Sequence, residues 1–328
     1  DLAEDVHEHF VAERAVVAVD HHAQHLRFAL GAVVVDGGGK LALGLAGAEH
    51  DVGIRFLDVD AGVKLAAKLV DDGCDGLVLG GTTGESPTTS TAEKLTLIRE
   101  VKNALGERAK IVAGAGNYST DSSVDLAQQS VNAGADALLI VTPYYSKPPQ
   151  EGVYQHFKTV ASAVDAPIML YDIPGRTATP IAEETAMRLA EVPNIVAIKE
   201  AKGDLAAGAR LYQKTELALY SGDDPINIPW LSVGATGFVS VVGHCAARTL
   251  RDMRTAFDRG DLAEALRLNS TMFPLNRAMA RSGGVSFAKA ALDIMGMSVG
   301  SPRLPQVPLS DEARDALLED LRQAGVVS

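Results

Sequence analysis

The chain has 328 residues, of which 47% are hydrophobic and 22% are charged, as in a globular protein with one large α/β domain. Its net charge of −12 argues against nucleic acid or an anionic membrane as a partner. No apolar run approaches the roughly 18 residues of a membrane helix, and the acidic start lacks the basic region of a signal peptide. Cys74 and Cys245 are far apart and in no metal-ligand spacing, so we expect a reducing compartment, the cytoplasm, with both as small core residues.

The first 56 residues differ in composition from the rest of the chain. Six of the eight histidines lie here, and Tyr, Trp, Pro and Met are absent. His21, His22 and His25 suggest a metal site, but no cysteine or well-spaced carboxylate completes a ligand set, so we predict no metal. The strand-like runs in this part are 15–19, 32–35 and, more weakly, 41–45. We treat residues 1–56 as an atypical N-terminal segment.

From Leu57 onward, amphipathic segments alternate regularly with short apolar runs. The predicted strands are 76–79, 110–113, 137–141, 167–171, 195–198, 217–220 and 237–241. The predicted helices among them are 63–70, 91–105, 122–133, 153–164, 182–189, 205–214 and 225–231. One further strand upstream would make eight, so the pattern predicts a (β/α)8 TIM barrel over 57–245. A doubly wound open sheet is the alternative, weakened by the lack of a glycine-rich dinucleotide turn after an early strand.

Residues 246–328 predict a helical extension at the C-terminal end. Helices are expected near 246–258, 261–280 and 285–295, followed by a loop marked by three prolines. A last helix is expected from Ser310 to Ala324, because Ser310 is a good N-cap and acidic residues follow it.

One lysine comes directly after a buried strand. Residues 195–198 are apolar and mostly β-branched, and Lys199 follows them. Burial disfavours the charged form of an amine and lowers its pKa, which makes it a nucleophile toward a carbonyl carbon. An isolated lysine at a strand end usually reaches water, so the interpretation depends on what lies around it.

Reactive side chains follow several other predicted strands, at the end where barrel enzymes carry their chemistry. These strand ends hold residues 80–86, 142–145, 171–176, Lys199 and 221–224. Each alone has an ordinary structural explanation, such as a turn, a packed phenol or a surface charge. Together they bring hydroxyls, phenols, a lysine and an arginine to one face. A lysine can form an imine, phenols and a threonine can relay protons, and an arginine can bind a carboxylate.

The motifs at these strand ends resemble those of the dihydrodipicolinate synthase family, within the class I pyruvate lyase/aldolase superfamily. The resemblance covers about residues 57–325. The matching motifs are Gly81-Thr82-Thr83-Gly84-Glu85-Ser86, Tyr144-Tyr145, Tyr171-Asp172-Ile173-Pro174-Gly175-Arg176, the strand ending in Lys199, and Arg303-Leu304-Pro305. The resemblance implies a carbon–oxygen lyase that condenses pyruvate with L-aspartate 4-semialdehyde through a Schiff base. This is the 4-hydroxy-tetrahydrodipicolinate synthase reaction of lysine biosynthesis via diaminopimelate.

The resemblance also implies roles for the catalytic residues. Lys199 would form the Schiff base with pyruvate, and Tyr171 would carry protons beside it. Thr82 would link Tyr171 to Tyr145, which would reach across a tight dimer into the neighbouring active site. The family is typically a homotetramer made of two tight dimers. No cofactor is implied beyond the covalent imine.

Substrate-binding residues are carried over in the same way. Thr83 would bind the pyruvate carboxylate, and Arg176 would bind the carboxylate of the semialdehyde. Gly222 and Val239 would supply backbone contacts around the imine. The alternative activity is that of another pyruvate-dependent aldolase, of the sugar-acid or N-acetylneuraminate type, which generally lacks an arginine at position 176. An inactive paralogue, caused by the altered N-terminus, is the other alternative.

The sequence departs from the family pattern in two places. Thr91, Lys94, Tyr118 and Ser122 stand where lysine-sensitive members have the ligands of a feedback lysine. A cation at Lys94 repels a second ammonium, so we predict weak or absent inhibition by lysine, checked by a lysine titration.

The second departure is at the first strand. Residues 49–51 are Glu-His-Asp where the family has Thr-Pro-Phe. Two interpretations remain open: a divergent first strand, or a stretch up to about Arg55 that is not native, as after translation in a wrong reading frame.

Overall fold

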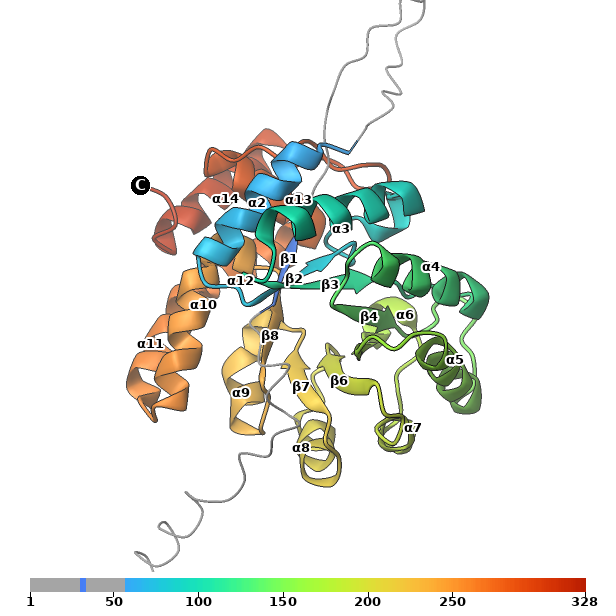
Figure 1. Cartoon of the computed structure of the whole chain (residues 1–328). Coiled ribbons are helices and arrows are strands. Elements are labelled where there is room, and N and C mark those ends of the chain that lie inside the picture. The colour runs from blue at the N-terminus through green and yellow to red at the C-terminus, as the bar shows by residue number, and fades with distance from the viewer. Residues whose placement is uncertain (1–29, 34–56) are drawn as a thin grey trace, which may run out of the picture.

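The structure, a computed structural model, describes residues 30–33 and 57–328. At its centre is a closed barrel of eight parallel strands in chain order, surrounded by helices (Figure 1). The strands are β1 (Leu30–Val33), β2 (Gly76–Leu79), β3 (Lys110–Gly114), β4 (Ala137–Val141), β5 (Ile168–Asp172), β6 (Ile195–Glu200), β7 (Ala218–Ser221) and β8 (Gly237–Ser240). The (β/α)8 barrel predicted from the alternation is confirmed.

The first strand closes the barrel from within the N-terminal segment of unusual composition. Leu30 of β1 is in register with Gly76 of β2 on one side and with Val239 of β8 on the other. This strand overlaps the predicted run 32–35. The other strand-like runs and the histidines His21, His22 and His25 lie outside the described residues, and the division of the chain at 56 and 245 stays a prediction.

The barrel helices follow the predicted pattern, with ends that differ by a few residues. They are α2 (Val59–Asp71), α3 (Thr91–Leu105), α4 (Thr120–Asn132), α5 (Gln150–Ser162), α6 (Pro174–Thr177), α7 (Glu183–Leu189), α8 (Leu205–Lys214), α9 (Asn227–Ser232) and α10 (Gly243–Asp258). Their starts have local causes. At α3, for example, Ser90 and Glu93 cap each other's backbone N–H groups in a capping box.

The C-terminal extension packs as four helices beside the barrel (Figure 1). They follow α10 and are α11 (Leu262–Thr271), α12 (Phe273–Ser282), α13 (Gly284–Ile294) and α14 (Asp311–Gln323), and all four share one hydrophobic cluster with α10. The single helix predicted near 261–280 is wrong, because the chain forms two helices that meet at Met272. Pro274 lies in the first turn of α12, where no backbone N–H is needed.

Side chains alternate in direction along each strand, which gives one hydrophobic layer inside the barrel and a second between the strands and the helices. Met169, Tyr171 and Ala197 point into the barrel, while Leu170 and Ile198 pack outward against the helices. Tyr171 and Lys199 are register partners on adjacent strands. Because successive side chains alternate, both point into the barrel, at the carboxyl ends of β5 and β6.

Candidate active site

Lys199 lies in the barrel interior beside a phenol ring. Lys199 is only 8% exposed, because it lies within β6. This strand continues through Glu200, whereas the sequence predicted that it ends at Ile198. The Lys199 Nζ lies 4.1 Å from the centroid of the Tyr171 ring, which is also buried. The amine thus lies over the face of the phenol ring, in the geometry of a cation–π contact.

Gly222, directly after β7, is shaped by the same lysine. A Cβ at position 222 would lie 2.8 Å from the Lys199 Cε, so any side chain here would displace the lysine. The Gly222 N–H donates to the Glu200 carbonyl oxygen at 2.7 Å, which fixes the end of β7 to that of β6. Val239, on β8, is buried in the interior cluster that includes Tyr171.

The loop after β2 carries Thr82 and Thr83 and is fastened by the C-terminal extension. Glu85 follows them with a left-handed backbone, φ +55°, and a fully buried carboxylate. Its Oε1 accepts from the Arg303 N–H at 2.7 Å, and its Oε2 lies 2.6 Å from the Lys289 Nζ on α13. Gly284, at the start of α13, is so close to Thr83 that a Cβ there would lie 3.4 Å from the Thr83 Oγ1.

A cavity of about 800 Å³ opens at this end of the barrel. It brings together three of the predicted site residues, Thr82, Tyr171 and Arg176. Lys199, Thr83, Gly222 and Val239 are not among its lining residues, but Lys199 lies against Tyr171, which is. The cavity wall thus contains hydroxyl groups and a guanidinium, next to the buried amine.

Tyr145 stands apart from the other predicted catalytic residues. It is 92% exposed, has φ +70°, and does not line the cavity. Its neighbour Tyr144 does line the cavity and makes an edge-on contact with the Tyr118 ring at 5.3 Å between centroids. Burial raises the pKa of the Tyr144 phenol. Within one chain, therefore, Tyr145 does not join Thr82 and Tyr171.

The positions tied to lysine sensitivity line the same cavity. Thr91, Lys94, Tyr118 and Ser122 all contribute to its wall. Burial lowers the pKa of Lys94, against the opposing effect of Glu93. Weak inhibition by lysine stays a prediction.

No metal site and no membrane span are found in the described part of the chain. Over residues 30–33 and 57–328, no three His, Cys, Asp or Glu side chains are grouped as metal ligands. Over the same residues, no helix has both the length and the apolar character needed to cross a bilayer. Cys74 and Cys245 are free thiols; Cys74 is buried in the core as expected, whereas Cys245 is only partly buried.

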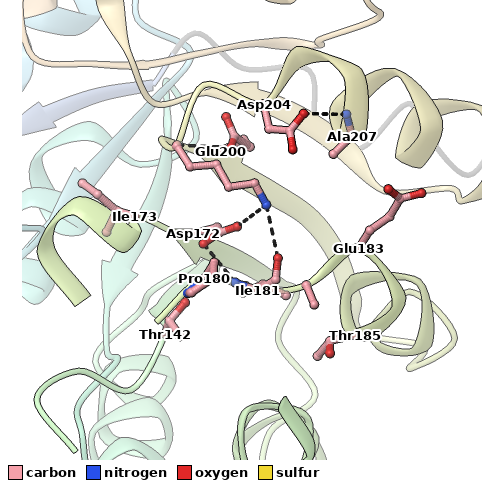
Figure 2. A network of polar contacts seen from close by, with 12 residues as sticks. Thr142, Asp172, Ile173, Pro180, Ile181, Glu183, Thr185, Glu200, Asp204 and Ala207 are labelled. Atoms are coloured by element: carbon pink, nitrogen blue, oxygen red, sulfur yellow. Dashed lines mark hydrogen bonds and ion pairs between the residues drawn. The ribbon is translucent and has the colours of Figure 1, made fainter. Parts of the chain in front are cut away.

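Sequence reasoning missed a buried polar network behind the two central strands. Asp172 and Glu200 each follow an inward-facing site residue, point away from the barrel interior, and are buried (Figure 2). Burial raises the pKa of both carboxyl groups, while Lys202 and backbone N–H groups partly offset that rise. The available signal was an acid next to an apolar strand on two neighbouring strands, with Lys202 three residues beyond Lys199.

The fold and the site define a barrel enzyme that keeps a lysine amine and a phenol together at the catalytic end of its strands. Residues 56–324 match the Dihydrodipicolinate synthetase family. A 4-hydroxy-tetrahydrodipicolinate synthase of Corynebacterium jeikeium is 56% identical over 82% of this chain and 90% of its own length. The chain therefore belongs to the Dihydrodipicolinate synthetase family.

Two solved structures agree with this assignment. A dihydrodipicolinate synthase of Bacillus anthracis has 36% identity and a TM-score of 0.84, covering 90% of this chain and 98% of its own. A chloride-inhibited dihydrodipicolinate synthase of Acinetobacter baumannii, complexed with pyruvate, has 34% identity and a TM-score of 0.84, covering 92% and 99%. The family and the lyase activity predicted from the motifs are confirmed.

Proposed function

We propose that the chain condenses pyruvate with L-aspartate 4-semialdehyde, the 4-hydroxy-tetrahydrodipicolinate synthase reaction, in the diaminopimelate route to lysine. The observation that carries the proposal is the buried Lys199 amine, 4.1 Å from the centre of the Tyr171 ring at the catalytic end of the barrel. The relative of Acinetobacter baumannii, described as complexed with pyruvate, supports the choice of first substrate.

The chemistry begins with the lysine amine. The Lys199 Nζ attacks the keto carbon of pyruvate, and loss of water gives an imine. Loss of a proton from the pyruvate methyl group then gives an enamine, whose carbon attacks the aldehyde carbon of the semialdehyde. The amino group of the semialdehyde can displace Lys199 from the imine carbon, which closes the ring and frees the enzyme. No cofactor is needed beyond this covalent imine.

Proton transfer is assigned to three hydroxyl groups. Tyr171 is the group beside the amine, and Thr82 lines the same cavity. The exposed Tyr145 completes the relay from the neighbouring subunit of a tight dimer, and two such dimers form a homotetramer. The 92% exposure of Tyr145 in the single chain supports this assignment, because its phenol is free to reach a neighbouring subunit.

Substrate carboxylates are assigned to Thr83 and Arg176. Thr83 is buried close to the barrel mouth and would bind the pyruvate carboxylate, with Gly222 and Val239 contributing backbone contacts. Arg176 lines the cavity and is exposed, so its guanidinium is free to bind the carboxylate of the semialdehyde in a bidentate pair. The free cysteines fit a reducing compartment, and we place the enzyme in the cytoplasm.

Borohydride trapping tests the proposal. Reduction in the presence of pyruvate should add one pyruvate-sized mass to the chain, and peptide mapping should place it on Lys199. Lys199→Met is the matched control and should give no adduct. A folded protein without an adduct, or with an adduct on another lysine, would contradict the proposed mechanism.

A further inference from the structure

Two charged residues outside the barrel interior connect the loop of Arg176 to the strand of Lys199. Asp172 ends β5 and is a register partner of Glu200 on β6, one residue beyond the pair of Tyr171 and Lys199. Since successive residues of a strand point to opposite sides, Asp172 and Glu200 point away from the reacting groups. The mechanism described above does not use them.

Asp172 and Lys202 hold the same backbone position from two sides. The Asp172 Oδ1 accepts from the Ile181 N–H at 3.1 Å, and its Oδ2 accepts from the Lys202 Nζ at 2.8 Å. The Lys202 Nζ also donates to the Ile181 carbonyl oxygen at 3.2 Å. Figure 2 shows these three contacts converging beside Ile181. Both polar groups of Ile181 are thereby fixed by one buried ion pair, which we call the Asp172–Lys202 clamp.

The clamp closes a short loop that presents Arg176. Residues 173–180 leave β5 after Asp172 and return to it at Ile181, with Arg176 in the single turn of α6 between them. Within the described residues, the Arg176 guanidinium has no ion pair or hydrogen bond that holds it, so its position depends on the backbone of this loop. Gln150 of α5 supports the far end, since its Nε2 donates to the Pro180 carbonyl oxygen at 2.8 Å.

Glu200 sets the position of Lys202 in turn. Its Oε1 accepts from the Lys202 N–H at 3.1 Å, and its Oε2 accepts from the Gly203 N–H at 3.0 Å. These bonds fold the chain back directly after β6, so that the Lys202 side chain reaches Asp172. The segment that begins at Lys199 is therefore joined through Lys202 to the loop of Arg176.

The charges make this connection sensitive to substitution. The Asp172 side chain is fully buried and that of Lys202 is 19% exposed. A carboxylate at this depth needs its partner, because an unpaired buried charge is strongly unfavourable. Without Lys202, both the ion pair with Asp172 and the hydrogen bond to the Ile181 carbonyl oxygen would be lost.

We propose that Asp172 and Lys202 are positioning residues that set the enzyme's efficiency toward the second, carboxylate-bearing substrate, by fixing the loop that presents Arg176. The inference rests on the proposed function, in which Arg176 binds that carboxylate. Pyruvate reacts first, at Lys199, and does not depend on the clamp.

Steady-state kinetics with Lys202→Met test the proposal. The methionine keeps most of the side-chain length but removes the charge and the donors. We expect kcat/KM for aspartate 4-semialdehyde to fall about tenfold to hundredfold, as for a lost charge-assisted contact. We expect kcat/KM for pyruvate and the rate of borohydride trapping to stay within about twofold. Lys214→Met, on the exposed end of the neighbouring helix α8, is the matched control and should leave all three unchanged.

A double variant separates positioning from general stabilisation. If the clamp acts through Arg176, adding Lys202→Met to Arg176→Ala should change the semialdehyde kcat/KM by less than about twofold, because the contact it positions is already absent. Additive losses, or equal losses for both substrates, would overturn the proposal.

Asp172→Asn provides a second route if Lys202→Met does not fold. The asparagine oxygen can still accept from the Ile181 N–H, so a smaller loss, again confined to the semialdehyde, is expected. Unchanged semialdehyde kinetics in this variant would overturn the clamp. A normal loss in Arg176→Ala without any loss in the clamp variants overturns the clamp alone, whereas no loss in Arg176→Ala overturns both the clamp and the proposed role of Arg176.

Discussion

At the scale of single residues, the proposed function predicts that turnover depends on the hydroxyl group of Tyr171, whose ring lies against the lysine amine. Tyr171→Phe keeps the ring against Lys199, where the centroid lies 4.1 Å from Nζ, and removes only the phenol oxygen. We expect kcat to fall about 10²–10⁴-fold, the usual effect of losing general acid–base catalysis. The matched control is Tyr212→Phe, since Tyr212 is an exposed phenol on α8. Near-normal turnover in Tyr171→Phe, measured by the rate of product formation, would remove this phenol from the mechanism.

A site residue could be predicted from the sequence where its type is unusual for its position in a strand or a loop. Lys199 is unusual because an amine follows four apolar strand residues, and Arg176 is unusual within a short loop motif. Lys202 could not be predicted in the same way, because its partner Asp172 lies 30 residues away. Only the strand register brings the two together. The acids after the two strands and the nearby lysine are visible in the sequence, but which of them pair is not.

At the scale of secondary structure, the C-terminal extension stabilises the barrel through one buried ion pair. The side chains of Lys289 on α13 and of Glu85 in the loop after β2 are each 2% exposed, with 2.6 Å between Nζ and Oε2. Lys289→Met leaves the Glu85 carboxylate buried without its ion-pair partner, which should destabilise the protein by about 3–5 kcal/mol. Adding Glu85→Gln should restore much of this loss, because the glutamine oxygen still accepts from Arg303.

Chemical unfolding of the unsubstituted protein, Lys289→Met and the double variant, at one protein concentration, measures this effect. The single variant Lys289→Met should have the lowest unfolding midpoint, and the double variant should lie closer to the unsubstituted protein. A double variant as unstable as Lys289→Met would show that packing, and not charge, holds α13 to the loop.

The elements themselves were largely predictable, because each strand and helix has its own apolar period. The predicted boundaries 76–79, 91–105 and 205–214 agree with β2, α3 and α8. The prediction was wrong for 261–280, where a continuous apolar period crosses Met272 but the chain turns and restarts with Pro274. The spacing of apolar residues indicates which face of a helix is buried, but it does not show whether one helix continues or a second helix begins.

At the scale of the whole molecule, closure of the barrel depends on a strand that was only one of three candidates in the N-terminal segment. Residues 30–33 pair with both β2 and β8, although the segment around them departs from the family pattern. Eight strands were expected from the alternation alone, because a barrel with a missing strand would expose two unpaired edges. The number of strands was therefore predictable from the alternation, while the first strand was narrowed only to three strand-like runs, of which 32–35 overlaps β1.

Two buried histidines should make the stability of the whole protein depend on pH. His156 on α5 is 3% exposed, its Nδ1 lies 3.0 Å from the Thr120 Oγ1, and burial lowers its pKa to about 4. His244 at the start of α10 is 1% exposed, and burial lowers its pKa to about 4 as well. An unfolded histidine titrates near 6.5, so below that pH the unfolded chain binds protons that the folded protein excludes.

The sign follows from this difference. Above about pH 6.5 neither histidine changes the free energy of unfolding. As the pH falls toward 4, each lowers the free energy of unfolding, by about 3 kcal/mol at the lower end. Glu93, whose pKa is lowered to about 2 chiefly by its hydrogen bond to Arg303, acts only below about pH 4.5. His156→Gln should therefore reduce the stability loss between pH 6.5 and 4.5, a loss that the raised pKa values of Asp172 and Glu200 partly offset. Urea unfolding at several pH values measures it, and an unchanged pH dependence in His156→Gln would show that His156 is not a source of the acid sensitivity.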